Sequence, residues 1–270
     1  MKLHIASAAG NIFGYLWADE VPQGFDGATW ARALCPRGIA FGLDGIFLLH
    51  RPGEGPWEMA HWDSDGALSF CSNGTRAALA LEGAPAGEWL EVRSSGQWVS
   101  LRRNASGVGL RMPEGEGTGL RPIPFPVFGA LGGRPAVYGL VGNPQLVVEV
   151  PSVETVDLAS FAPPLRHHRA FKDGTNVNVL EVTGEREARI RSWERGVEGE
   201  TLCCGTGCAV AGAWLAQRTG RGEWSLLTAS GETVSVALEI LPGGAWRNLW
   251  VSGPVRRIGE AAPDKDLLPA

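Results

Sequence analysis

Apolar residues alternate with polar or small residues in several short stretches of the chain, which is the period of a half-buried β-strand. The clearest case is the series Val234, Val236, Leu238 and Ile240. Short, largely apolar runs predict further strands at residues 46–49, 89–92, 98–101, 146–150 and 177–182. The pattern therefore predicts many short strands along the whole chain.

Two segments depart from this alternation and predict helices. They are residues 74–81, GTRAALAL, and residues 207–217, GCAVAGAWLAQ. The second is apolar nearly all round, so we expect it to be buried. Strands alternating with several amphipathic helices are not seen, and neither G-x-G-x-x-G nor G-x-x-x-x-G-K occurs. These absences argue against a phosphate-binding dinucleotide fold.

An internal repeat organises the chain. Gly10-Asn11 recurs as Gly142-Asn143, and residues 71–74, CSNG, recur as residues 204–207, CGTG. Other pairs follow in the same order at similar spacing: Gly42-Leu43-Asp44 with Gly174-Thr175-Asn176, Trp62-Asp63 with Trp193-Glu194, Glu88-Trp89 with Glu223-Trp224, and Ser95-Gly96 with Ser230-Gly231. The alternative is one domain in which these matches arise by chance.

The repeat predicts two copies of one half-sized fold, with a seam in the Gly- and Pro-rich segment 111–126, which cannot hold a helix or a central strand. We expect an N-terminal half at residues 1–115 with the first cysteine of the repeat. The C-terminal half spans residues 116–270 with the second, and its last residues are expected to pack back on the N-terminal half.

Composition and charge narrow the class of protein. The chain has 270 residues, of which 44% are hydrophobic, so it can bury a substantial core. Its 38 glycines and 18 prolines indicate many turns. A net charge of −5 without a basic tract argues against nucleic-acid binding. No apolar run reaches the length of a membrane span, and the N-terminus lacks a signal-peptide pattern, so a cytoplasmic location is expected.

Two of the five cysteines carry the candidate chemistry. Cys71 and Cys204 each stand before a glycine-containing turn and a predicted helix, at equivalent points of the repeat. Backbone N–H groups and the positive end of the helix dipole favour a bound carboxylate or oxyanion there. The same field is expected to lower the pKa of each thiol.

Two acid–base groups flanking one carbon suit the inversion of a stereocentre. One thiolate removes the α-proton from one face, and the other thiol delivers a proton to the opposite face. The two helix N-termini would bind the α-carboxylate and stabilise the charge that develops on it. This chemistry needs no cofactor.

Other roles for the cysteines fit the sequence less well. Cys35, Cys203 and Cys208 fit buried small hydrophobic residues, and an odd number of irregularly spaced cysteines argues against a disulfide framework. A zinc site from Cys203, Cys204 and Cys208 lacks C-x-x-C spacing and a nearby histidine, so no metal is expected. The five histidines show no motif with a cysteine, which argues against a cysteine protease, and a thioredoxin-like pair would need C-x-x-C.

The motifs taken together resemble the diaminopimelate epimerase family, the PLP-independent two-cysteine epimerases of lysine and peptidoglycan biosynthesis. The resemblance covers the whole chain and is strongest at residues 191–207, RSWERGVEGETLCCGTG. Further matches are Gly10-Asn11 with Phe13, residues 71–76, residues 142–144 and residues 174–178. It implies an α/β fold of two pseudo-symmetric halves. Each half is a curled, mostly antiparallel β-sheet wrapped around a central α-helix, and the active site lies in the cleft between them.

The resemblance also implies a role for each site residue. Cys71 and Cys204 would be the acid–base pair, and Glu194 and the residue at position 145 would tune the pKa of the thiols. Ser72, Asn73, Gly205 and Thr206 would hold the α-carboxylate. The amino groups and the distal end of the substrate would contact Asn11, Asp63, Asn143, Asn176, Glu194 and Arg195. The partners implied are a small amino-acid substrate and, as is common in the family, a second copy in a homodimer. The alternative for the Glu194–Arg195 pair is two solvated charges at a strand end.

Several positions depart from the family pattern. Gln145 replaces a histidine thought to tune the first cysteine, and a carboxamide cannot exchange a proton at neutral pH. Asp63 replaces an asparagine near the distal carboxylate, and an anion there would repel that group. Gly45 stands for a glutamine, Ile12 for an aspartate and Ser72 for a glycine. The two-thiol chemistry is unaffected by these changes, whereas the distal specificity is open.

Three hypotheses follow. The first is a diaminopimelate epimerase that interconverts the LL and meso isomers. The second is a racemase of another amino acid, with a distal cation that Asp63 could pair. The third is a non-catalytic or weakly catalytic amino-acid-binding homologue, because Gln145 removes a tuning group.

Overall fold

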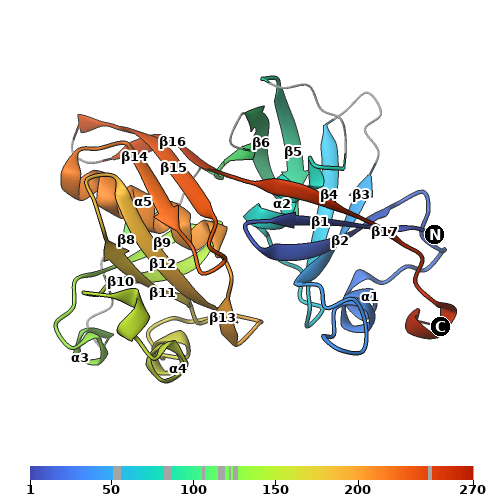
Figure 1. Cartoon of the computed structure of the whole chain (residues 1–270), viewed down its shortest axis with the longest axis horizontal. Helices are drawn as coiled ribbons and strands as arrows, with labels where there is room; N and C mark the ends of the chain where they lie inside the picture. The colour runs from blue at the N-terminus through green and yellow to red at the C-terminus, as the bar shows by residue number, and fades with distance from the viewer. Residues whose placement is uncertain are drawn as a thin grey trace. The chain divides into compact units, whose positions relative to one another are not determined.

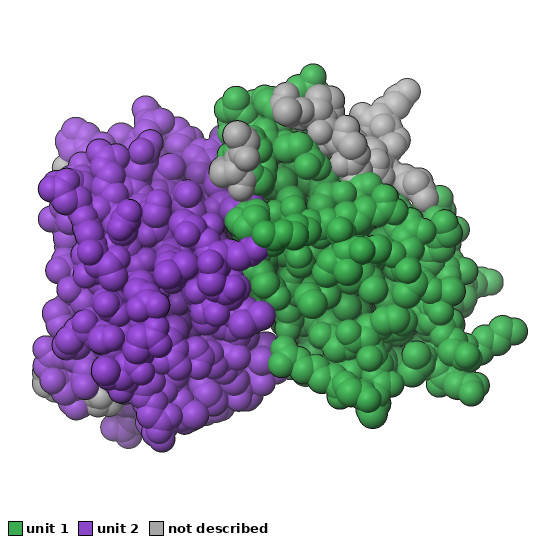
Figure 2. Space-filling view, in the orientation of Figure 1, with its two compact units in different colours: residues 1–110, 254–270 green, residues 111–253 purple. Residues whose placement is uncertain are grey.

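The computed structural model describes residues 1–50, 56–81, 87–104, 107–114, 119–121, 123, 127–242 and 245–269. The chain divides into two compact units, coloured separately in Figure 2. Unit 1 contains Met1–Leu110 and Pro254–Ala270, and unit 2 contains Arg111–Gly253. The domain boundary expected at residues 115 and 116, and half of the predicted seam, lie outside the described residues. The boundary therefore stays a prediction.

Unit 1 is built on a mixed β-sheet (Figure 1). Its strands are β1 (Leu3–Ala8), β2 (Asn11–Trp17), β3 (Gly45–His50), β4 (Trp57–Asp63), β5 (Trp89–Ser94), β6 (Gln97–Asn104) and β17 (Val255–Ala261); β7 (Gly107–Arg111) follows β6. From β17 through β1, β2, β3, β4 and β5 to β6, neighbouring strands pair antiparallel except for two parallel pairs, β2–β3 and β4–β5.

Unit 2 repeats this pairing order. Its strands are β8 (Gly119–Arg121), β9 (Ala136–Val141), β10 (Asn143–Glu149), β11 (Asn176–Val182), β12 (Glu187–Glu194), β13 (Gly199–Thr201), β14 (Glu223–Leu227), β15 (Thr233–Ile240) and β16 (Trp246–Gly253). Here β10–β11 and β12–β14 are the parallel pairs between otherwise antiparallel neighbours. The register of the first parallel pair differs by one residue, because Phe13 pairs with Gly45 whereas Gln145 pairs with Asn176, the counterpart of Asp44 in the repeat. The predicted two-fold α/β architecture is confirmed.

Both predicted helices are present, with shifted ends. Helix α2 (Ser72–Ala78) begins two residues earlier than predicted and ends before residues 79–81. Helix α5 (Gly205–Thr219) begins two residues earlier than predicted and is capped by Gly220. The φ of 71° at Gly220 lies in the left-handed region, which favours glycine because it has no Cβ. Helix α5 is buried along most of its length and contacts β9, β10, β11, β14, β15 and β16.

Further helices were not predicted. Helix α1 (Gly27–Leu34) lies in unit 1, and α3 (Phe128–Leu131) and α4 (Leu158–Arg166) lie in unit 2, with short 3₁₀ turns η2 (Val153–Thr155) and η4 (Lys265–Leu267). Helix α4 has two prolines inside it, a composition that argues against a helix in the sequence. None of the helices in the described part of the chain combines the length and apolar character that crossing a membrane requires.

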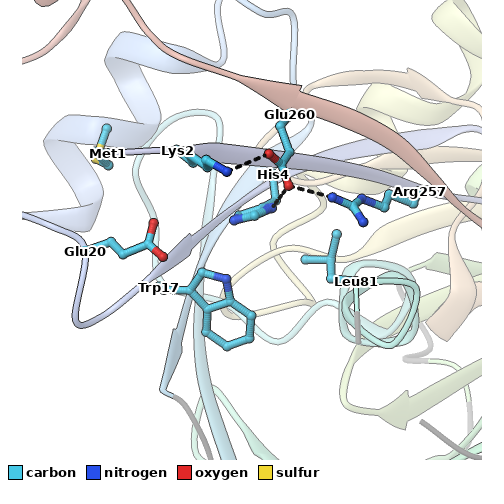
Figure 3. Close-up of a pocket in the computed structure, with 8 residues that line it drawn as sticks. All are labelled: Met1, Lys2, His4, Trp17, Glu20, Leu81, Arg257 and Glu260. Atoms are coloured by element: carbon cyan, nitrogen blue, oxygen red, sulfur yellow. Dashed lines mark hydrogen bonds and ion pairs between the residues drawn. The ribbon is translucent and has the colours of Figure 1, made fainter. Parts of the chain in front are cut away.

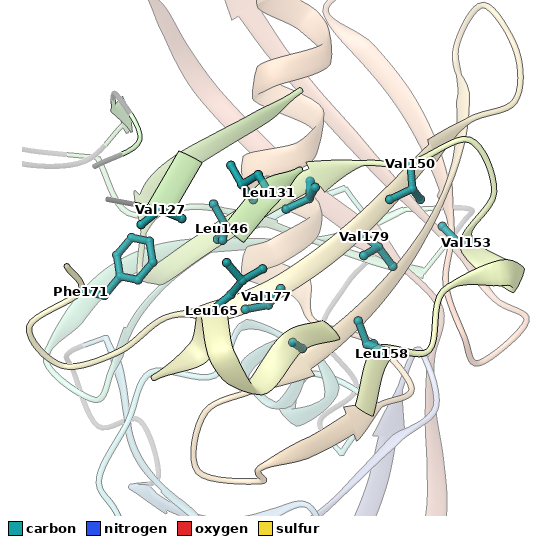
Figure 4. Close-up of a cluster of buried hydrophobic side chains, with 12 residues drawn as sticks. Val127, Leu131, Leu146, Val150, Val153, Leu158, Leu165, Phe171, Val177 and Val179 are labelled. Carbon is teal, nitrogen blue, oxygen red and sulfur yellow. The ribbon is translucent and has the colours of Figure 1, made fainter. Parts of the chain in front are cut away.

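Strands β10 and β11 of unit 2 are buried on both faces, which explains their continuous apolar runs. On one face, Leu158 and Leu165 of α4 pack against Val177 and Val179 of β11 (Figure 4). The alternate side chain, Asn178, belongs to the opposite face, where its amide oxygen lies against Gly207 of α5. Unit 1 has a corresponding cluster around α1, made of Leu3, Leu16, Trp30, Ala31, Leu34, Cys35, Leu43 and Ile46.

Candidate active site

Cys71 stands at the N-cap of helix α2, as the sequence predicts. Its backbone is extended, with φ −124° and ψ 107°, and its Sγ accepts a hydrogen bond from the backbone N–H of Gly74 at 3.5 Å. The Cys71 carbonyl accepts from both the N–H and the hydroxyl of Thr75. Position 74 must be glycine, because a Cβ there would lie 2.2 Å from the ring of Phe47. The half-buried thiol is therefore held by the first turn of the helix.

A buried polar network fixes the residues beside Cys71. The Asn73 amide donates to Asn11 Oδ1 at 2.8 Å, and the Arg76 guanidinium donates to Asn73 Oδ1 at 2.8 Å. Asp44 accepts from the Asn11 amide at 3.3 Å and from the backbone N–H of Ile12 at 2.8 Å. The sequence predicts Asn11 and Asn73 as site residues, whereas the roles of Asp44 and Arg76 appear only in the structure.

Tyr15 was also missed from the sequence. Its hydroxyl donates to the carbonyl of Gly74 at 2.7 Å, and its ring stacks on Phe47 with centroids 5.1 Å apart. Burial raises the pKa of Tyr15 well above its usual value, with the nearby Cys71 adding to the rise and Arg76 opposing it. Tyr15 therefore stays a neutral hydrogen-bond donor beneath helix α2.

Gly45 and Asp63, two positions that differ from the family pattern, both lie next to His61. The imidazole is fully buried, with Nδ1 3.1 Å from Ser69 Oγ and 3.8 Å from Asp63 Oδ1. Burial lowers its pKa to about 3, so it is neutral at physiological pH. A Cβ at Gly45 would lie only 2.3 Å from His61 Nε2. His61 thus fills the space that a side chain at position 45 would take.

Cys204 occupies the equivalent N-cap of helix α5 in unit 2. Its backbone is extended, with φ −110° and ψ 104°, and the residue is 3% exposed. Its Sγ lies 3.5 Å from Thr206 Oγ1 and 3.6 Å from Gln145 Nε2. The sequence links position 145 to the first cysteine, whereas the structure brings its amide against the second.

The pKa of Cys204 runs opposite to the sequence expectation. Burial raises it well above the usual value, and the charge of Glu194 raises it further. Hydrogen bonds from Thr206 and from the backbone N–H of Gly207 act in the other direction and are outweighed. The expected lowering by the helix N-terminus is therefore wrong for Cys204 in the unliganded protein, because desolvation of the thiolate is the larger effect.

The remaining predicted residues of unit 2 lie at the ends of strands or at the start of helix α5. Asn176, the first residue of β11, accepts through Oδ1 from the backbone N–H of Arg195 at 2.7 Å. The Arg195 guanidinium donates to the carbonyl of Asp173 at 3.2 Å, and Glu194 accepts from the hydroxyl of Thr201. Asn143 begins strand β10, while Gly205 and Thr206 form the start of α5. Ser72 is the corresponding first residue of α2 in unit 1 and is buried.

A cavity in unit 1 lies outside the predicted site. It measures about 660 Å³ and is lined by Met1, Lys2, His4, Trp17, Glu20, Leu81, Arg257 and Glu260 (Figure 3). Glu260 binds Lys2 at 3.2 Å, His4 at 3.3 Å and Arg257 at 2.5 Å, so its charge is already compensated by neighbours. Within the described ranges, no three His, Cys, Asp or Glu side chains gather closely enough to hold a metal ion.

Comparisons with known proteins agree with the motifs. The family model described as diaminopimelate epimerase matches residues 137–239. The diaminopimelate epimerase of Thermosynechococcus vestitus is 33% identical over 250 residues, covering 82% of this chain and 81% of that protein. That of Chlorobaculum tepidum is 30% identical over 267 residues, covering 93% and 97%.

Solved structures match the fold over nearly the whole chain. A phenazine biosynthesis protein of the PhzF family from Bacillus anthracis has a TM-score of 0.71 at 14% identity, covering 97% of this chain and 98% of that one. A hydroxyproline epimerase from Agrobacterium vitis, solved with bound trans-4-hydroxy-L-proline, has a TM-score of 0.67 at 13% identity, covering 97% and 91%. At such identities the likeness concerns the fold alone.

Proposed function

The chain belongs to the diaminopimelate epimerase family as an amino-acid epimerase, and we propose that it interconverts LL- and meso-diaminopimelate with Cys71 and Cys204 as its two acid–base groups. The observation that carries this proposal is the repeated placement of a cysteine at a helix N-cap. Cys71 caps α2 and Cys204 caps α5, in units that share one strand order. We also propose the accompanying family properties: a role in lysine biosynthesis, a cytoplasmic location and a homodimer.

The proposed reaction is a proton exchange at the α-carbon. The thiolate of one cysteine takes the α-proton, so an S–H bond forms while the C–H bond breaks. The electron pair left on carbon delocalises into the α-carboxylate as an enediolate-like charge. The thiol of the other cysteine then gives its proton to the opposite face, which restores a tetrahedral carbon of inverted configuration. Each cysteine ends in the protonation state from which the reverse reaction starts.

We assign Cys204 as the proton donor of the unliganded enzyme. Its raised pKa favours the thiol form, because burial and the charge of Glu194 both disfavour a thiolate. Cys71 is only half-buried and has the Gly74 N–H at its sulfur, an arrangement that supports a proton-accepting thiolate. The assignment reverses after each turnover, as a two-base mechanism requires.

The substrate contacts follow from the same assignment. Ser72, Asn73, Gly205 and Thr206 are proposed to hold the α-carboxylate at the two helix starts. The amino groups and distal end are assigned to Asn11, Asp63, Asn143, Asn176, Glu194 and Arg195. Diaminopimelate carries an ammonium and a carboxylate at its far end, so Arg195 can bind the carboxylate and Asp63 the ammonium. This pairing supports diaminopimelate despite the negative charge of Asp63.

A second candidate is a racemase of another amino acid with a distal cation. The observation that favours it is the Asp63 carboxylate beside a buried neutral His61, at the position where the resemblance has a neutral amide. Ornithine and lysine are the substrates that such a site would fit. The third hypothesis, a binder without turnover, is tested by the same experiment.

The test is stereochemical conversion by the purified protein. LL-diaminopimelate, ornithine, lysine, histidine and proline are incubated separately, and the isomers are resolved by chiral chromatography. We expect conversion of diaminopimelate, and loss of it in both Cys71→Ala and Cys204→Ala. Cys203→Ala is the matched control, because Cys203 is an adjacent cysteine of equal burial that carries no proposed role. Faster conversion of ornithine or lysine would favour the second candidate, and no conversion of any substrate would favour the binder.

A further inference from the structure

A chain of buried polar side chains runs across unit 2 to Cys204. Gln145, Asn178 and Ser192 come from the neighbouring strands β10, β11 and β12, and each is 0–2% exposed. The Ser192 hydroxyl donates to Asn178 Oδ1 at 2.7 Å. Asn178 Nδ2 donates to Gln145 Oε1 at 2.9 Å, and Gln145 Nε2 donates to Thr206 Oγ1 at 2.7 Å.

A backbone carbonyl sets the direction of every hydrogen bond in this chain. Asn178 lies 3.1 Å from the carbonyl oxygen of Leu146, which can only accept, so the amide nitrogen of Asn178 must face it. That same nitrogen also meets the Gln145 amide, so the Gln145 oxygen must point toward Asn178. The Gln145 nitrogen is thereby turned toward Thr206 and the Cys204 sulfur.

The hydrogen-bond direction of the Thr206 hydroxyl is fixed as well. Its oxygen accepts from Gln145 Nε2, so its own hydrogen is available to the Cys204 sulfur 3.5 Å away. The sulfur also lies 3.8 Å from Gln145 Oε1, to which a protonated thiol can donate. A thiolate instead accepts from the nearer Gln145 N–H and from the Thr206 O–H, both of which favour the anion. Helix α5 packs directly against these side chains, because a Cβ at Gly207 would come within 2.3 Å of Asn178 Oδ1.

We propose that Asn178 and Ser192 are positioning residues that lock the Gln145 amide with its N–H toward Cys204, so that a neutral, fixed donor stabilises the thiolate formed when Cys204 gives up its proton. The inference rests on the proposed function and deepens it. A carboxamide without a fixed neighbour can turn its oxygen toward the sulfur and repel the thiolate. The relay, formed by Ser192, Asn178 and Gln145, keeps that oxygen bonded to Asn178 at 2.9 Å and 3.8 Å from the sulfur, so that the amide nitrogen stays the nearer atom at 3.6 Å.

Other groups near the sulfur oppose the stabilisation of the Cys204 thiolate by the relay. The titratable groups that act on Cys204 are Glu194 and Cys203, and both disfavour its thiolate. Because Gln145 does not titrate, it contributes no ionisation of its own to the pH dependence of the reaction. The donor therefore acts equally across the working pH range.

The experiment reads the pKa of Cys204 in the whole protein without substrate. Alkylation by iodoacetamide is followed against pH, and peptide mass spectrometry separates Cys204 from the other cysteines. Hydrogen bonds to charged groups are strong, so we expect Gln145→Leu and Asn178→Leu to raise the pKa of Cys204 by about one to two units. The value of kcat should fall about ten- to a hundredfold with a smaller change in KM.

Three further variants separate positioning from simple stability. Gln145→His keeps an N–H donor and is expected to retain kcat within about tenfold while adding an ionisation near neutral pH. Ser192→Ala removes only the far end of the relay and should raise the pKa of Cys204 by a smaller amount. Thr228→Val removes a buried hydroxyl elsewhere in unit 2 and should leave that pKa unchanged.

An unchanged pKa of Cys204 in folded Ser192→Ala and in folded Gln145→Leu or Asn178→Leu would overturn the inference. A pKa that rises equally in Thr228→Val would do so too, because the effect would then be one of general loosening. The proposed function fails separately. A protein that turns over no amino acid can still show the pKa shifts, and an active enzyme without them contradicts the relay alone.

Discussion

Replacing Gly45 by alanine tests how His61 and Gly45 fit together. The Gly45 backbone does not need the positive φ that favours glycine, so the only obstacle to a side chain is space. An added Cβ would lie 2.3 Å from His61 Nε2 and 2.7 Å from the carbonyl oxygen of Trp62. The first atom belongs to a fully buried ring that lies 4.5 Å, centroid to centroid, from Phe47. The second belongs to the backbone of β4, which pairs with β3 at this point.

The expected cost follows from these distances. Ordinary Cβ contacts begin near 3.4 Å, so the imidazole must retreat by roughly 1 Å or the strand pair must open. Overpacking of this kind costs about 1–3 kcal/mol. We expect urea denaturation of Gly45→Ala, followed by circular dichroism, to show a loss of unfolding free energy in that range.

A double-mutant cycle assigns the cost to the imidazole. His61→Ala removes the closest atom, so Gly45→Ala should cost at least about 0.5 kcal/mol less in that background than in the native one. A Gly45→Ala variant as stable as the native protein would refute the packing argument. Strict additivity in the cycle would show that the Trp62 carbonyl, and not His61, excludes a side chain at position 45.

Three further predictions follow from the site. His61 has a pKa of about 3 in the folded protein against 6.5 when exposed, so its contribution to stability is complete above pH 6.5 and is lost as the pH falls toward 3. One such group changes the unfolding free energy by up to about 1.4 kcal/mol per pH unit, so His61→Leu should flatten the pH dependence of that free energy between about pH 6 and pH 4. Parallel curves for the variant and the native protein would contradict this. Gly207→Ala should displace Asn178 and lower kcat at least about tenfold, measured by initial rates, whereas an unchanged kcat would show that the contact is dispensable. Asp63→Asn should change kcat/KM for diaminopimelate by less than about tenfold, and a large gain from almost none would identify a racemase of a distally cationic amino acid instead.

The repeat was predictable because its markers are turns and helix starts. The turns need glycine or asparagine for their backbone conformation, and a cysteine precedes each helix, so these residue types are found in both copies. Exact register was not predictable in this way, because Phe13 pairs with Gly45 whereas Gln145 pairs with Asn176, the counterpart of Asp44. The order of parallel and antiparallel pairs could not be read from strand patterns, because alternation records burial and not the direction of a neighbour.

Helix α4 was missed because its composition argues against a helix. Helix α4 contains Pro163 and Pro164, yet it is held by Asp157 at its N-cap and by apolar residues packed on β11. Tertiary packing thus outweighs a composition that disfavours a helix. Residues 79–81 were predicted as helix on composition alone and form turns instead.

Candidate site residues could be found from the sequence where they stand in a repeated motif. Cys71 and Cys204 follow from the repeat, as do Asn11 and Asn143 of its Gly-Asn pairs, although Asn178 had no assigned role. His61 carries no motif, and only its burial and the gap at Gly45 reveal it. The direction of the Cys204 pKa was predicted wrongly, because a sequence shows the helix start but not the desolvation of its sulfur.

Solvent deuterium incorporation during the first few per cent of reaction tests the central claim most directly. LL-diaminopimelate is incubated with the enzyme in deuterated water, and the α-positions of product and remaining substrate are measured by NMR and mass spectrometry. Two separate cysteine bases predict deuterium at the inverted α-carbon of the meso product and retention of hydrogen in the recovered LL substrate. Equal incorporation into both isomers at this stage would point to one shared base and contradict the account, as would product that carries no deuterium.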